Sequence, residues 1–175
     1  MTDLRSLGPR TRFLWYFTAA LVHAVACGVF AWRLADGPLH FQSKDLPLVA
    51  GAVGVAAAVL AIPQLGVLNG ARGTRWLILS GGVGLGTLSI WVVVAAASVL
   101  YLCARMATAA SADEVVLLIP FMYFAPLIGP MKVAETSSGT IFLLGAALGL
   151  FDAILVVLSR RRASATANGG SGIGK

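Results

Sequence analysis

Five long apolar blocks, almost free of charge, constrain this chain more than any other feature of its sequence. A helix needs about 20 residues, with a lower limit near 17, to cross the hydrocarbon core of a bilayer. Hydrocarbon offers no partner for backbone amides, so an isolated apolar segment of this length spans as a helix. We predict an all-α integral membrane protein with a single transmembrane helical domain over residues 13–159. The five blocks are residues 13–32, 46–68, 76–102, 115–131 and 141–158.

The overall composition supports a membrane protein. Hydrophobic residues make up 58% of the 175 positions and charged residues 11%, with a mean hydropathy of +0.88. A soluble domain carries about 25% charged residues. These figures exclude a soluble enzyme, a nucleic-acid-binding module, a disordered regulator and a disulfide scaffold.

The excess of positive charge sits at the ends of the apolar blocks. The net charge is +6, from 13 Lys and Arg against 7 Asp and Glu. Bases in these positions set topology and meet anionic lipid headgroups, so we expect lipid as the partner and no nucleic acid. A basic segment, residues 1–12, precedes the first block, and residues 160–175 are predicted to form a basic, then flexible, tail. The headgroup-binding candidates are Arg10, Arg12, Arg160, Arg161 and Arg162.

The fourth block, residues 115–131, is ambiguous because it contains Pro120, Pro126 and Pro130. Each proline removes a helical hydrogen bond. If this block does not span, nine bases share the side of both termini and four lie on the other, whereas five spans give six against seven. The positive-inside bias favours four transmembrane helices plus a proline-broken segment. That segment is re-entrant, interfacial or a fifth span.

The same charge bias suggests where the protein resides. Both termini are expected on the cytoplasmic side, where bases accumulate. Arginine outnumbers lysine ten to three, and the chain is rich in Ala, Gly and Val. We take this composition to favour the inner (plasma) membrane of a bacterium.

Asp152 is the one acidic residue inside the apolar blocks. It lies eight residues before Arg160, about 12 Å along a helix. Burying aspartate at such a depth costs a few kcal/mol, so its side chain should face protein or water. Gly145 and Gly149 share its helical face and form a GxxxG pattern, which lets helices approach closely. Asp152 is therefore either a proton or cation site or a protonated acid bonded to a neighbouring helix.

His23, Gln64 and Ser89 are the polar candidates in the first three blocks. Each lies on a face of small residues, typical of helix packing in lipid. With both termini on one side, Gln64, Asp152 and His23 lie about 8, 12 and 16 Å from that side. We predict a polar cluster inside the bundle, although such groups can also serve as packing contacts between helices. The remaining glycines assigned to helix packing are Gly54, Gly82 and Gly86.

The first block also has some features of a cleavable signal. Three arginines precede it, and Cys27 follows small residues. Its apolar stretch is long, aromatic and interrupted by His23, so we expect a retained helix.

The sequence contains few residues or motifs typical of cofactor binding or catalysis. Cys27 and Cys103 lack CxxC or metal-ligand spacing, and we interpret them as packing residues. A haem with two buried axial histidines is not expected, because the other histidine, His40, lies in a predicted loop. The chain has no HExxH or GxSxG sequence and no paired carboxylates in one span. We expect no metal, no cofactor and no enzymatic activity.

Two functional hypotheses remain. The first is a non-catalytic accessory or assembly subunit of a larger membrane complex, suggested by short loops and small-residue faces that suit other subunits or self-association. The alternative is a small proton- or cation-coupled transporter or channel, oligomeric, that uses Asp152 and His23.

Overall fold

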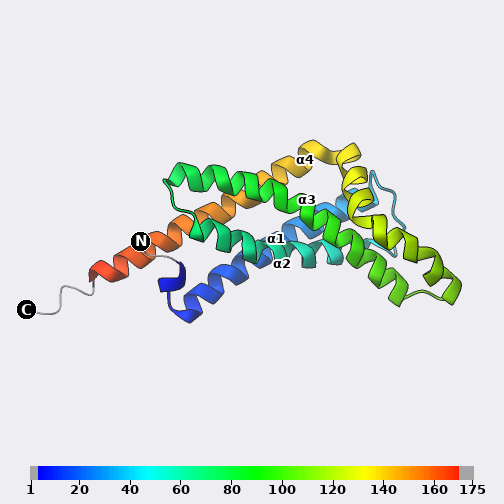
Figure 1. Cartoon of the computed structure of the whole chain (residues 1–175), viewed down its shortest axis with the longest axis horizontal. Coiled ribbons are helices and arrows are strands. Elements are labelled where there is room, and N and C mark those ends of the chain that lie inside the picture. The colour runs from blue at the N-terminus through cyan, green and yellow to red at the C-terminus, as the bar shows by residue number, and fades with distance from the viewer. Residues whose placement is uncertain (1–3, 170–175) are drawn as a thin grey trace, which may run out of the picture.

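The computed structural model describes residues 4–169, and this part of the chain is helical with no strand (Figure 1). Its four long helices are each long and apolar enough to cross a membrane. The prediction of an all-α, multi-pass membrane protein is confirmed at this level. The elements are η1 (Leu4–Ser6), α1 (Pro9–Asp36), α2 (Leu46–Gly70), α3 (Arg75–Ala107) and α4 (Ala112–Gly169).

Some helix ends differ from the sequence-based boundaries. α1 begins at Pro9 instead of residue 13, because proline at the first helical position has a suitable φ and no amide hydrogen to satisfy. Residues 163–169 of the predicted flexible tail continue α4 as a helix. The rest of that tail, residues 170–175, lies outside the described residues.

α4 consists of two arms that meet at a kink. Ser137 has φ −153° and ψ 26°, outside the helical region. The first arm, residues 112–136, contains the ambiguous block and runs back beside the end of α3, while the second arm crosses the bundle (Figure 1). The prediction of a proline-broken segment is wrong about the position of the break. The helix continues through Pro120, Pro126 and Pro130, and it breaks in a Thr-Ser-Ser-Gly stretch, whose side chains compete for backbone hydrogen bonds.

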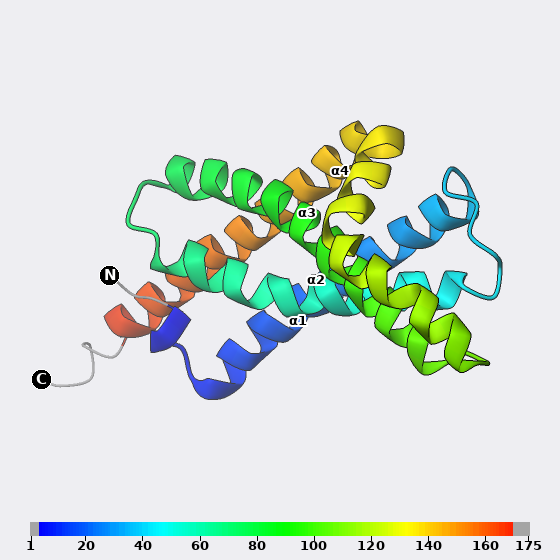
Figure 2. The ribbon, with the colours of Figure 1, turned by 45° about the vertical axis from the view of Figure 1, so that its right-hand side comes forward.

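Both described termini lie at the same end of the bundle. η1 and the end of α4 lie near the α2–α3 turn, and the α1–α2 and α3–α4 loops lie at the opposite end (Figure 2). We call these the terminal end and the far end. The chain therefore traverses the bundle four times, in α1, α2, α3 and the second arm of α4.

Glycines allow α3 and the second arm of α4 to touch backbone to backbone. A Cβ on Gly86 would overlap the carbonyl oxygen of Gly145, and one on Gly149 would overlap that of Gly82. On the other helix pair, a Cβ on Gly54 of α2 would lie 3.2 Å from the Ala24 carbonyl oxygen of α1. The five glycines assigned to helix packing thus lie at close helix contacts within the chain.

Polar clamps hold the two ends of the bundle. At the terminal end, the Arg160 guanidinium donates to the carbonyl oxygens of Leu68 (3.4 Å) and Asn69 in the last turn of α2 and to that of Ala71 (3.1 Å) just after it. At the far end, Arg105 contacts Asp45 at 3.2 Å and Glu114 at 3.3 Å. Arg105 thereby joins the end of α3 to the starts of α2 and α4.

Candidate functional site

The structure brings His23 of α1 and Asp152 of α4 together inside the bundle. His23 Nε2 lies 3.2 Å from Asp152 Oδ2. His23 is 3% exposed and Asp152 is 0% exposed. The ring and the carboxyl group are within ion-pair distance but are not aligned for a hydrogen bond. Two groups able to carry charge thus face each other without access to the surface.

The hydrogen bond of the other ring nitrogen of His23 determines which of the two nitrogens carries the hydrogen in the neutral imidazole. His23 Nδ1 lies 2.8 Å from the carbonyl oxygen of Ala19, one turn earlier on α1. A carbonyl accepts only, so Nδ1 is the donor and keeps its hydrogen. In the neutral ring, Nε2 is then the basic nitrogen, and it faces the carboxyl group of Asp152.

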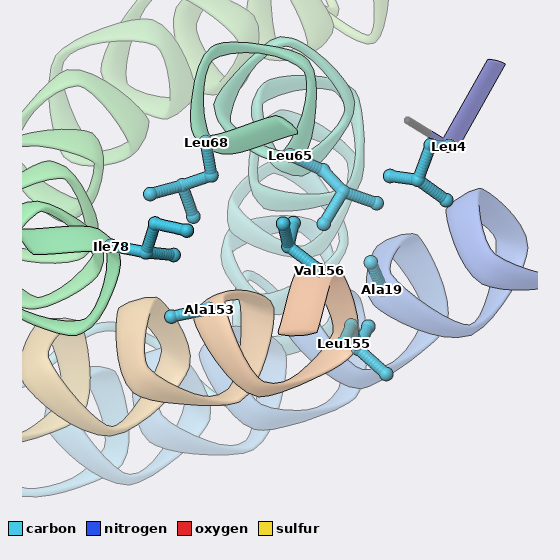
Figure 3. Close-up of a cluster of buried hydrophobic side chains, with 8 residues drawn as sticks. All are labelled: Leu4, Ala19, Leu65, Leu68, Ile78, Ala153, Leu155 and Val156. Carbon is cyan, nitrogen blue, oxygen red and sulfur yellow. The ribbon is translucent and has the colours of Figure 1, made fainter. Parts of the chain in front are cut away.

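An apolar cluster closes the site toward the terminal end. Ala19, Leu68 and Val156 lie four residues from His23, Gln64 and Asp152 respectively, and all three belong to this cluster. Figure 3 shows α1, α2, α3 and α4 contributing to it. The cluster consists of Leu4, Ala19, Leu65, Leu68, Ile78, Ala153, Leu155 and Val156.

A second apolar cluster closes the other side. It includes Cys27 and Leu148, one helical turn from His23 and Asp152 in the opposite direction, together with Ala57 two turns before Gln64. His23, Gln64 and Asp152 therefore occupy one level of the bundle, between two apolar layers. We call these three residues the polar layer.

Gln64 is the third member of the polar layer. Its side chain is 5% exposed, and neither its amide nitrogen nor its amide oxygen has a hydrogen-bond partner in the described structure. Asp152 Oδ1 is also without one. Buried polar groups are normally bonded, and an unbonded one costs about 1–3 kcal/mol. The polar layer therefore contains buried hydrogen-bonding atoms of Gln64 and Asp152 that are unsatisfied within the described structure.

The remaining polar candidate, Ser89, is not part of the contacts that hold the pair. Ser89 is half-buried on α3, one turn beyond Gly86. The described contacts of His23 and Asp152 run instead to each other, to the Ala19 carbonyl and, for the His23 ring, to Phe151 at 6.4 Å between centroids.

The basic candidates have different surroundings. Arg160 is the clamp on α2 described above. The guanidinium of Arg162 lies over the Trp15 ring, 6.0 Å from its centroid. Arg10 and Arg161 are exposed and Arg12 is half-buried.

Sequence reasoning missed two features on the far-end side of the polar layer. One is the Arg105 clamp, whose members Asp45 and Glu114 are far apart in the sequence and gave no local signal. The other is a large apolar pocket on the far-end side of the layer, which Cys27 helps to line. An apolar residue in a membrane helix has the same sequence signature whether it faces lipid, a core or a pocket.

Comparisons of the chain with protein-family models, with curated proteins and with solved structures give no match. Among residues 4–169, no three His, Cys, Asp or Glu side chains come together as a group that could hold a metal ion.

Proposed function

We propose that this protein is a small proton-coupled transporter or channel in which His23 and Asp152 bind the coupling proton. The observation that carries the proposal is the 3.2 Å approach of the two side chains at full burial. Ionisable residues inside membrane segments are expensive, and they characteristically mark ion pathways and proton relays.

The chemistry of the pair favours one shared proton. Since Nδ1 already holds a hydrogen, one further proton lies either on His23 Nε2, giving imidazolium and carboxylate, or on Asp152, giving two neutral groups. Both arrangements have zero net charge. Adding a second proton or removing the shared one leaves a unit charge between apolar layers, which is unfavourable in a medium of low dielectric constant.

The unfavourable energy of a net charge on the pair can couple proton binding to a change of conformation. A net charge on the pair is stabilised by hydration or by a polar neighbour, and the unbonded amide of Gln64 lies at the same level. The charged state therefore favours a conformation in which α1 and α4 separate enough to admit water. A proton shifts the equilibrium between two conformations only through such a difference in affinity.

The accessory-subunit hypothesis has less support from the geometry. It rested in part on faces of small residues available to partner proteins. The glycines on these faces pack within the chain, as at Gly82 against Gly149 and at Gly54 against Ala24. The hypothesis stays a prediction, and other exposed surfaces could serve it.

For topology, we propose four crossings, with both termini cytoplasmic and the first arm of α4 at the opposite interface. The shared end of the two termini supports this arrangement (Figure 2). The count of bases on the two sides favours it too.

Proton flux into liposomes tests the proposed function. The purified protein is reconstituted with pyranine inside the vesicles, and a potassium gradient with valinomycin sets a potential that draws protons inward. Wild-type protein should acidify the lumen faster than protein-free vesicles do. Asp152→Asn and His23→Gln should reduce the flux at least tenfold, because each removes a proton-binding group at nearly constant volume.

Glu135→Gln is the matched control, since Glu135 is an exposed carboxylate that pairs with Lys132 outside the polar layer. Its flux should equal that of wild type. Folded Asp152→Asn and His23→Gln proteins with full flux would refute the proposal, and wild-type vesicles no faster than empty ones would refute a proton channel.

A further inference from the structure

The far half of the bundle contains an apolar pocket of about 550 Å³. All four helices contribute walls, with Phe30 on α1, Val53 on α2, Val93 on α3 and Phe121 on α4 among them. Cys27, Ile90, Val93 and Ala97 of the second apolar cluster form part of its wall, and neither His23 nor Asp152 is in its lining. The pocket is thus separate from the polar layer.

The course of α4 creates this space. Its first arm approaches α3 so closely that a Cβ on Gly129 would overlap the hydroxyl of Ser98. After the kink at Ser137, the second arm packs against α3 through the glycine contacts nearer the terminal end. The pocket lies where side chains of the first arm face α1 and α2 across the gap between these contacts.

The size of the pocket selects the kind of occupant. A spanning helix is a cylinder about 10 Å wide and 30 Å long, roughly 2,400 Å³. That is several times the pocket, so a partner helix does not fit. Pockets for small molecules measure about 300–1,000 Å³, and the acyl chains of the surrounding bilayer are apolar ligands available to this one.

One charge among the lining residues selects the headgroup. Lys132 is the charged member of the lining, on the first arm of α4 near the polar kink. Its contact with Glu135 is 3.4 Å long and both side chains are about two-thirds exposed. Exposed pairs of this kind contribute little, so the ammonium group can exchange this partner for a phosphate.

We propose that the pocket binds one acyl chain of an anionic phospholipid from the surrounding bilayer, with its phosphate at Lys132. The lipid's second chain remains in the bilayer. The proposal goes beyond proton coupling and does not depend on it.

Photo-crosslinking in nanodiscs tests the assignment. Discs of phosphatidylcholine contain a trace of phosphatidylglycerol with a diazirine at the end of one chain, or phosphatidylcholine with the same labelled chain. The labelled phosphatidylglycerol should crosslink to pocket residues such as Val93 and Phe121 at least fivefold more than the labelled phosphatidylcholine. Lys132→Gln should abolish that difference.

Val93→Phe and Val92→Phe form a matched pair. Val93 lines the pocket and is 3% exposed, while its neighbour Val92 is outside the lining and 44% exposed. Val93→Phe should cut pocket crosslinking at least fivefold and Val92→Phe should leave it unchanged. If Val93→Phe fails to fold, Ala125→Leu on the first arm of α4 fills the same pocket.

Three results would overturn the proposal. Crosslinks spread evenly over exposed faces would indicate ordinary surrounding lipid. Equal labelling by the two lipids would show that the pocket does not select an anionic headgroup. Displacement of the label by free palmitate but not by unlabelled phosphatidylglycerol would identify a fatty acid as the occupant. Since none of these readouts measures protons, failure here leaves the flux experiment unaffected.

Discussion

His23 Nε2 and Asp152 Oδ2 approach to 3.2 Å from the first and last helices of the bundle. The contact lies between two apolar clusters and ties α1 to the second arm of α4. It therefore has a structural consequence that is independent of proton movement and can be measured as a coupling energy.

A double-mutant cycle of His23→Gln and Asp152→Asn should show non-additive stability. Each single change leaves a buried polar group poorly matched, and we expect it to destabilise the protein by about 1–3 kcal/mol. The coupling energy should be about 1 kcal/mol or more, above the average of about 0.6 kcal/mol for hydrogen bonds between membrane helices. Unfolding of purified protein in mixed micelles gives these free energies.

The comparison cycle is Lys132→Gln with Glu135→Gln, an exposed pair at 3.4 Å. Its coupling should be close to zero. Additive effects in the His23–Asp152 cycle would mean that the two side chains do not interact in the folded protein.

Gly86→Ala should destabilise the crossing of α3 and α4. Its Cβ would overlap the Gly145 carbonyl oxygen and lie 2.6 Å from the Gly149 Cα, atoms of a backbone that cannot rotate away. Overpacking typically costs about 1–3 kcal/mol. Gly84→Ala, on the same helix with open space around it, should be neutral or stabilise by up to about 1 kcal/mol. Equal effects of the two substitutions on unfolding would argue against the close crossing.

Arg160→Gln should lower the stability of the terminal end of the bundle. The substitution removes charge-assisted hydrogen bonds to carbonyl groups at the end of α2, each worth about 1.5–3 kcal/mol. Arg161→Gln is the control, because Arg161 is exposed and should change stability by less than about 0.5 kcal/mol. Hydrogen exchange should localise the loss to residues 66–71. Unchanged protection there would contradict the clamp.

Cysteine labelling should place Ser138 on the same side of the membrane as the α1–α2 loop. Single cysteines at Ser43 and Ser138, in a background without Cys27 and Cys103, report the far end, and one at Thr74 reports the terminal end. With four crossings, an impermeant maleimide should label positions 43 and 138 from one side and position 74 from the other. Labelling of 138 together with 74 would make the first arm of α4 a fifth span.

The apolar pattern was enough to predict the class of fold. Blocks of sufficient length predict helices whatever their neighbours, because the backbone has no other partner in hydrocarbon. The same local reasoning failed at α4. Three prolines suggested a break, but the helix continues through them and the kink falls at Ser137 instead.

For the polar residues, too, the sequence predicted one part of the arrangement and the structure decided the other. Their spacing placed His23, Gln64 and Asp152 on small-residue faces at comparable depth, which predicted a cluster. Spacing along single helices cannot say which faces meet, because rotation and pairing of helices depend on packing across the bundle. The structure pairs His23 with Asp152 and leaves Ser89 out of their contacts.

By itself, the sequence determined that this chain is a helical membrane protein with few buried charges, since solvation of backbone and side chains acts on each segment separately. The tertiary structure alone decided that two of the polar residues meet, that Arg160 clamps α2, and that a pocket opens beside them. These features depend on how closely helices approach, and that distance is set jointly by residues far apart in the chain.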